Sequence, residues 1–345
     1  MFELYHLTRN RLHDCLERML RVAIAGAAHP HVQFALDEIT VTPELELVGV
    51  SDRAIDVAQR YARPFAAPIF TDHRELITAT APDVVVVAGI YGDRGDVIVD
   101  ALNAGSHVIA DKPMCITLDQ LDRIAEVQAA SQRELILLLE KRYYPETLAA
   151  REVVERGELG TIIGITSSGP HKLNAETRPA WFFNEQTYGG ILNDLTVHDI
   201  DLVLQFTALE SGTVSGATSG TSDTHPGFSL YGAATLRTAE AVVTVEAHWR
   251  TPAASAVHGD YQMRLVGTKG VAEIYWARQS VIVTTDSVAS RELTLSAAPR
   301  VAESSFRALL DGSEPDIRSE DGITATRIAL LAQQSAEHLG EALPW

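Results

Sequence analysis

Cysteine is scarce in this sequence, and long apolar runs are absent. The 345 residues include two cysteines, Cys15 and Cys115, too few for a disulfide framework or a cysteine-based metal centre. No apolar run approaches the roughly 18 residues that cross a membrane. The first twenty residues also lack the apolar core of a signal peptide. We therefore expect a cytoplasmic protein.

Positive charge is scarce as well, since the formal net charge is −18. A surface this acidic repels nucleic acids and anionic membranes, so neither is expected as a partner. The lysines, which can each be examined individually, are Lys112, Lys141, Lys172 and Lys269. With 46% hydrophobic residues, the chain can bury one large core or two moderate ones.

Strand and helix patterns alternate along residues 21–142. The continuous apolar run 84–88 is typical of a strand buried on both faces of a parallel sheet, and 107–110 reads as another strand. This alternation predicts a Rossmann domain, a doubly wound parallel sheet, over 21–142. Residues 1–20 carry apolar positions at helical spacing and predict a helical extension.

The turn after the first strand retains part of a dinucleotide-binding fingerprint. Gly26 stands at its first glycine position, while Ala28 and His31 replace the other two glycines. Asp52 follows the second strand, where an acidic side chain binds the adenosine ribose. Its alternative role is to cap the next helix. Asp52 favours NAD, and Arg53 beside it leaves NADP open.

Asp111-Lys112-Pro113 follows the fifth predicted strand, at the sheet edge where ligands bind in such folds. A lysine at this edge is partly desolvated, so it can relay protons or stabilise an alkoxide. The alternative is a solvated lysine at a strand end. Pro113 also permits a cis peptide bond.

From residue 161 the pattern changes to strands separated by turns, without helices between them. The expected strands are 162–167, 240–250, 261–266, 271–274 and 281–284. They predict an antiparallel sheet in a second, α+β domain over 143–345, closed by a helix at 321–340.

Residues 189–201 begin with two glycines and continue with apolar residues at helical spacing. On such a helix Asp194 and His198 are four residues apart and share a face, which Asp201 can join. A carboxylate can orient an imidazole and raise its basicity for acid–base chemistry. A capped helix with a surface ion pair is the alternative.

The order of these motifs resembles the Gfo/Idh/MocA family of NAD(P)-dependent sugar and polyol oxidoreductases. The resemblance covers residues 21–338. It rests on four segments: the glycine turn, Asp111-Lys112-Pro113, Arg142-Tyr143-Tyr144-Pro145 and the stretch 189–201. It implies a substrate-binding and oligomerisation domain at 143–345 and a homodimer or homotetramer.

The resemblance also implies roles for individual residues. The catalytic residues would be Lys112, Asp194 and His198. Cofactor contacts would come from Gly26, Ala28, His29, His31, Asp52, Arg53, Gly89, Ile90, Tyr91, Asp111, Lys112 and Trp181. Substrate contacts would come from Lys112, Arg142, His171, Asp194 and His198.

The expected reaction is reversible hydride transfer between nicotinamide and a carbinol carbon of a sugar, inositol or related polyol. His198 would take the hydroxyl proton, Lys112 would stabilise the alkoxide, and Asp194 would orient His198 or hold a substrate hydroxyl. Two other functions stay open: glycoside cleavage or elimination with transient redox, and dinucleotide-dependent regulation without catalysis.

A zinc site is a further alternative, built from His29 and His31 with His171. No spaced set of carboxylates or cysteines accompanies these histidines in the sequence. We therefore expect no metal and assign His29 and His31 to the phosphate loop.

Overall fold

The computed structural model describes residues 19–345, which form two compact units. The first unit comprises the described residues up to Asp111, together with Arg123–Leu138 and Arg300–Ser319. The second comprises Lys112–Asp122, Leu139–Pro299 and Glu320–Trp345. The predicted helical extension lies outside the described residues, apart from its last two positions.

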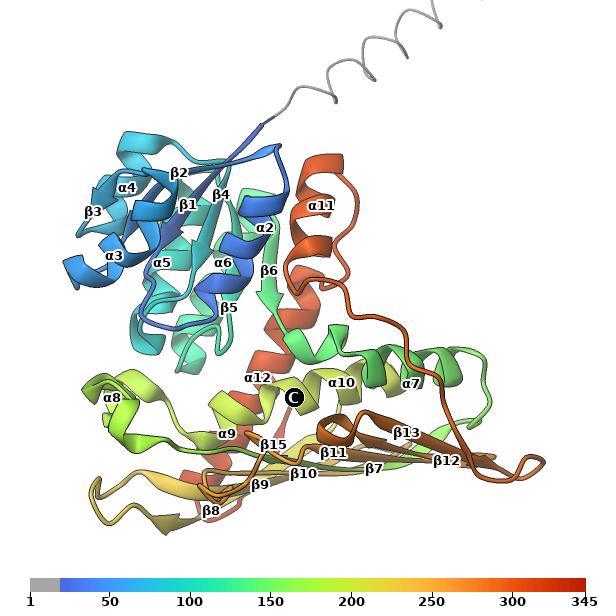
Figure 1. The fold of residues 1–345 in the computed structure, drawn as a ribbon. Coiled ribbons are helices and arrows are strands. Elements are labelled where there is room, and N and C mark those ends of the chain that lie inside the picture. The colour runs from blue at the N-terminus through green and yellow to red at the C-terminus, as the bar shows by residue number, and fades with distance from the viewer. Residues whose placement is uncertain (1–18) are drawn as a thin grey trace, which may run out of the picture. The chain divides into compact units, whose positions relative to one another are not determined.

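A parallel sheet of six strands forms the centre of the first unit (Figure 1). Its order is β3-β2-β1-β4-β5-β6, the doubly wound order in which dinucleotides bind at the carboxyl edge. The strands are β1 (Leu20–Ala25), β2 (Leu45–Ser51), β3 (Ile69–Phe70), β4 (Val84–Val87), β5 (His107–Asp111) and β6 (Leu135–Leu138). All residues of β4 and β6 are buried, because helices cover a parallel sheet on both faces.

Helices alternate with these strands. They are α2 (Val32–Val41), α3 (Ile55–Ala62), α4 (His73–Thr80), α5 (Tyr91–Asn103) and α6 (Leu118–Ser131), with α11 (Glu303–Asp311) added from late in the chain. Within residues 19–345, no helix combines the length and the apolar character needed to cross a membrane.

The second unit contains a nine-stranded sheet in the order β14-β13-β12-β11-β7-β10-β9-β8-β15. Its strands are β7 (Ile162–Pro170), β8 (Thr213–Thr221), β9 (Ser229–Arg237), β10 (Val242–His248), β11 (Gln262–Gly267), β12 (Gly270–Tyr275), β13 (Ser280–Thr285), β14 (Arg291–Glu292) and β15 (Leu343–Pro344). The pairing of β7 with β10 is parallel and the other pairings are antiparallel.

One face of this sheet is covered by α7 (Pro145–Glu155), α9 (Ile191–Leu195) and α10 (Val197–Thr207) (Figure 1). The remaining helices of the unit are α8 (Glu185–Tyr188) and α12 (Ser319–Glu337), with short 3-10 turns η2 (Glu140–Tyr143), η3 (Ala175–Thr177), η4 (Ala180–Phe183) and η5 (Trp276–Arg278). The helices on the sheet carry the site described below.

The predicted fold class is confirmed: a Rossmann unit is joined to an α+β unit with a large, mostly antiparallel sheet. Four strands of this sheet were not predicted: β8, β9 and the two-residue strands β14 and β15. The sequence of β8 consists of serine, threonine, glycine and alanine with a single valine, so it lacks the apolar alternation that signals a strand. The sheet is also mixed rather than wholly antiparallel, because β7 and β10 pair in parallel.

Candidate active site

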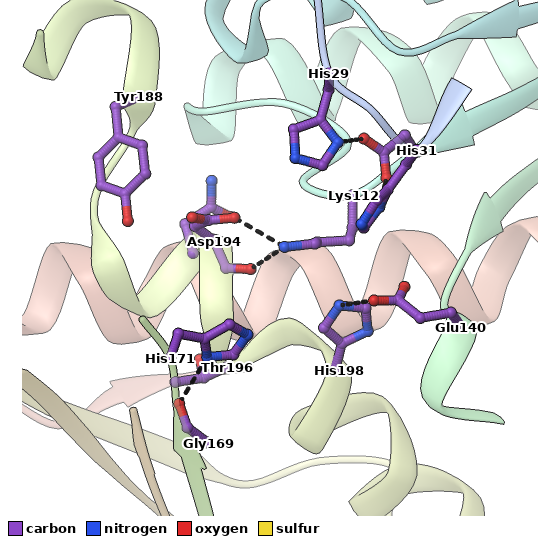
Figure 2. Close-up of polar contacts among 12 residues, drawn as sticks. His29, His31, Lys112, Glu140, Gly169, His171, Tyr188, Asp194, Thr196 and His198 are labelled. Atoms are coloured by element: carbon purple, nitrogen blue, oxygen red, sulfur yellow. Dashed lines mark hydrogen bonds and ion pairs between the residues drawn. The ribbon is translucent and has the colours of Figure 1, made fainter. Parts of the chain in front are cut away.

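Lys112 is the first residue after β5 and belongs to the second unit. Its Nζ donates to Oδ1 of Asp194 at 2.9 Å and to the backbone carbonyl oxygen of Asp194 at 3.2 Å (Figure 2). Both side chains are buried, with 7% and 1% of their surface exposed. The Lys112–Pro113 peptide bond is cis. Burying an ammonium group is costly unless it is paired, and the carboxylate of Asp194 supplies the partner of Lys112.

Two glycines, Gly189 and Gly190, lie immediately before α9. Gly189 and Gly190 have φ angles of +78° and +92°, which residues with a Cβ rarely adopt. A Cβ on Gly189 would lie 2.5 Å from the side chain of Ile116, and one on Gly190 would lie 2.2 Å from that of Gln333. The glycine pair therefore allows α9 to start in contact with these two neighbours.

The predicted single helix over 189–201 is two helices, α9 and α10, which meet at Thr196. Oγ1 of Thr196 donates to the carbonyl oxygen of Leu192 at 2.5 Å, a bond of the kind that bends helices. Asp194 and His198 are only 1% and 2% exposed. The alternative of a surface ion pair is therefore excluded.

His198 lies against a carboxylate that the sequence analysis did not assign to the site. Its Nε2 is 3.3 Å from Oε1 of Glu140, the first residue of η2 (Figure 2). The carboxylate predicted to orient the ring was that of Asp194, which instead bonds Lys112. Helical spacing identifies neighbours on one helix but not a partner that arrives from another segment. A carboxylate at Nε2 favours the tautomer with its proton on Nε2 and its acceptor lone pair on Nδ1.

The two residues after Glu140 also bind α10. Nζ of Lys141 lies 3.0 and 3.2 Å from the carboxylate oxygens of Asp199. Arg142 donates from Nε and Nη2 to Asp201 at 2.8 and 2.6 Å. All four side chains are buried. Arg142 was predicted to contact substrate, and the structure directs these donors to Asp201.

His171 follows β7 and is a neutral imidazole at pH 7. Burial is the main cause that holds its pKa well below the usual range, and the charge of Lys112 adds to this effect. Nδ1 donates to the carbonyl oxygen of Gly169 at 3.0 Å, so Nε2 is a hydrogen-bond acceptor. The ring contacts those of Trp249 and Tyr261, with centroids 5.4 and 4.9 Å away.

In the first unit, the turn after β1 passes very close to the end of β4. Gly26 has a φ of +85°, and a Cβ placed on it would lie 2.7 Å from Cα of Gly89. The N–H of His29 donates to the carbonyl oxygen of Ala88 at 2.8 Å. This backbone contact fixes the loop that leads into α2. Where glycine lets two backbone segments come this close, backbone N–H groups can reach a bound pyrophosphate.

Asp52 connects this turn to the end of β2. Oδ2 accepts from the N–H of Ala27 at 2.8 Å, and Oδ1 accepts from the N–H of Ala54, the cap residue of α3, at 2.9 Å. Asp52 and Gly26 line a cavity of about 270 Å³, and so do Arg53, Gly89 and Ile90. Asp52 thus bonds the backbone on both sides of the turn but is not the N-cap of α3, which is Ala54; its contact with the ribose stays a prediction.

His29 and His31 converge on Asp111, the last residue of β5. Their Nδ1 atoms each lie 2.9 Å from one of its carboxylate oxygens. Burial lowers the pKa of His29 to about 4. For Asp111 burial alone would raise the pKa, but Arg94, His31 and His29 hold it well below the usual range. The loop is thus attached to β5 through Asp111, which His31 contacts by a hydrogen bond and His29 at 2.9 Å.

Three such groups within 4.8 Å of one another have the chemistry of metal ligands. Arg94 occupies the same carboxylate, since its Nη2 donates to Oδ2 of Asp111 at 2.8 Å and its Nη1 donates to the Asp111 carbonyl oxygen. This buried guanidinium already supplies the positive charge that a metal would bring. The expectation that the chain uses no metal stays a prediction.

Two family models match this chain. The NAD-binding Rossmann-fold model of an oxidoreductase family matches residues 20–139, and the GFO/IDH/MocA C-terminal domain matches residues 147–273. The chain belongs to the Gfo/Idh/MocA family of oxidoreductases. The resemblance inferred from the motifs is therefore confirmed.

Among its relatives is the D-glucoside 3-dehydrogenase of Escherichia coli, 30% identical over 56% of each chain. The aligned part is thus about half the length of that relative. The uncharacterized oxidoreductase YrbE of Bacillus subtilis is 25% identical over 88% of this chain and 90% of its own. A levoglucosan dehydrogenase solved with NADH and levoglucosan has the same fold, with a TM-score of 0.81 and 18% identity over 94% and 98% of the two chains.

The predicted residues fall into two groups. Lys112, Asp194, His198 and His171 lie in the second unit; Lys112 bonds Asp194, His198 lies against Glu140, and the charge of Lys112 acts on His171. The predicted cofactor residues outside it surround the ends of β1, β2, β4 and β5 in the first unit. Trp181 is in η4 of the second unit and packs on Phe182, so its cofactor contact stays a prediction.

Several residues that build the site were missed by the sequence analysis. They are Arg94, Glu140, Lys141 and Asp199. Lys141 carried a usable signal, because lysine is scarce in this chain. Nothing in the spacing of the other three indicated their partners, which lie far away along the sequence.

Proposed function

We propose that the chain is an NAD-dependent dehydrogenase that transfers a hydride between nicotinamide and a carbinol carbon of a sugar or related polyol. The observation that carries this proposal is the buried Lys112–Asp194 pair, together with the His198–Glu140 pair in the same unit. Membership of an NAD-binding oxidoreductase family supports it. The sugar substrates named for two relatives support the substrate class.

The residues of the first unit fit a dinucleotide. The Gly26–Gly89 approach leaves no room for a Cβ at the turn, and the turn leads directly into the N-terminus of α2. Asp52 presents a carboxylate where a ribose hydroxyl would donate, and its charge disfavours a ribose 2′-phosphate. Bound NAD would supply the hydride acceptor at its nicotinamide ring.

The second unit would handle the proton of the substrate hydroxyl. His198 would accept that proton as the general base, with Oε1 of Glu140 3.3 Å from its Nε2. Glu140 then stabilises the imidazolium ion that forms. The Lys112 ammonium stabilises negative charge on the same oxygen, and Asp194 fixes its position. His171 offers Nε2 as an acceptor for a neighbouring hydroxyl.

The test is NADH formation by the purified protein with NAD or NADP and a panel of sugars, methyl glycosides and inositols. Lys112→Met and His198→Asn should each lower kcat by about 10²–10⁴-fold. Matched controls are Lys269→Met and His338→Asn, which change exposed residues of the same types. Full turnover in both site variants would refute the assigned roles, and net glycoside cleavage without NADH would favour the transient-redox alternative.

A further inference from the structure

The second unit contains a cavity that the proposed chemistry does not use. It has a volume of about 390 Å³, within the range of small-molecule sites. We call it the Tyr144 pocket; its walls include Tyr144, Glu146, His258, Tyr261, Trp276 and Gln279. The first two belong to the segment that enters α7, and the others belong to the loop before β11 and to η5 and its cap residue.

The aromatic walls of this pocket are held in place from behind. Nε1 of Trp276 donates to Oγ1 of Thr147 at 2.9 Å. Nζ of Lys141 lies 4.8 Å from the ring centroid of Tyr261 and 5.0 Å from that of Trp276. Lys141 is itself bound to Asp199, the neighbour of His198 on α10. Tyr261 and Trp276 are therefore linked through Lys141 and Asp199 to α10, the helix that carries the proposed base His198.

The lining chemistry favours a neutral ligand. Among residues 19–345, no lysine or arginine lines the pocket. Partial burial lowers the pKa of His258, which is thus neutral at pH 7, and burial raises the pKa of the Glu146 carboxyl. Flat aromatic faces with an imidazole, an amide and phenol groups suit a ring that has apolar faces and hydroxyl edges, which is the chemistry of a neutral sugar.

His171 connects this pocket to the proposed reacting centre. Its ring centroid is 5.3 Å from that of His258 and 4.9 Å from that of Tyr261. The charges of Lys112 and Asp194 also act on the pKa of His171. The His258 loop is fixed in position, because the N–H of Lys172 donates to the carbonyl oxygen of His258 at 2.9 Å.

We propose that the Tyr144 pocket is a second sugar subsite, which binds the ring joined by a glycosidic bond to the sugar that is oxidised. The substrate class is then a disaccharide or a glycoside with a sugar-sized aglycone. This inference rests on the proposed function for the identity of the reacting sugar. It adds a binding site that the hydride-transfer proposal does not require.

The test compares methyl D-glucoside with the disaccharides cellobiose and maltose, by NADH formation and by calorimetric titration into the NADH-loaded protein. For the better disaccharide, we expect a kcat/KM at least about tenfold above that of methyl glucoside. The variants are His258→Ala and Gln279→Ala, both at exposed positions. Each should remove most of that advantage and leave methyl glucoside unaffected, because one or two hydrogen bonds are lost. Arg278→Ala, next to the pocket and exposed, is the control.

The outcomes separate the two proposals. NADH formation without an advantage for either disaccharide, or with equal effects of the variants on all substrates, overturns the subsite alone. Disaccharide binding that depends on His258 without NADH formation overturns the proposed function alone. If no sugar binds, the subsite is overturned. A change in subunit number in the variants, measured by light scattering, would identify the pocket as a contact between copies of the chain and would also overturn it.

Discussion

His29 should make the stability of the protein sensitive to acid. Burial, opposed in part by the charge of Asp111, lowers the pKa of His29 from 6.5 to about 4. Between these values the folded protein keeps His29 neutral while the unfolded chain binds a proton. Because the unfolded state then holds more protons, the free energy of unfolding falls as the pH falls below 6.5 and levels off near 4. Between pH 7 and pH 5 the loss from His29 is about 2 kcal/mol.

The measurement is denaturant unfolding followed by fluorescence at pH 7 and pH 5, for the wild type and His29→Gln. Glutamine can donate to Asp111 but does not titrate, so the variant should lose about 2 kcal/mol less than the wild type between the two pH values. His171 is buried in both proteins, and its contribution cancels in the comparison. The exposed substitution His338→Gln should follow the wild type. Equal losses in wild type and His29→Gln would refute the reasoning.

Three other substitutions test the site. Glu140→Gln should lower kcat/KM about tenfold or more, because the imidazolium ion of His198 loses its anion. The increase of kcat/KM with pH should also shift to lower pH, and an unchanged pH profile would contradict this. Asp199→Asn leaves Lys141 buried without its carboxylate and should cost about 3–5 kcal/mol of unfolding free energy, largely recovered by adding Lys141→Met. Asp52→Ala should raise the KM for NAD and reduce any preference over NADP, measured by initial rates.

The parallel sheet could be predicted from the sequence because its signals are local. A run such as 84–87 is apolar at every position, which is typical of a strand that helices cover on both faces of its sheet. The strands of the second sheet were harder. β8 carries few apolar side chains, and the parallel pairing of β7 with β10 joins segments about 80 residues apart along the chain. Neither feature has a local signature.

The candidate site likewise combines residues that the sequence could identify with partners that it could not. Lys112, Asp194 and His198 could be selected from residue type and position. Their partners could not, because periodicity along one helix cannot show that Glu140 approaches from the end of another strand. The cluster around Asp111 was missed for a related reason. Arg94 lies on α5, and only the packing of that helix brings its guanidinium to the end of β5.

The charges on α10 give a physical reason for the form of this site. Burying a helix that contains His198, Asp199 and Asp201 costs desolvation free energy unless their polar and charged groups find partners. The partners are three consecutive residues, 140–142, so one short segment satisfies all three positions. The ion pairs of Lys141 and Arg142 tie the segment that carries Glu140 to α10. The ion pairs of Lys141 and Arg142 therefore help to keep Glu140 beside His198, and weakening either pair should loosen the contact of Glu140 with the proposed base before it unfolds the protein.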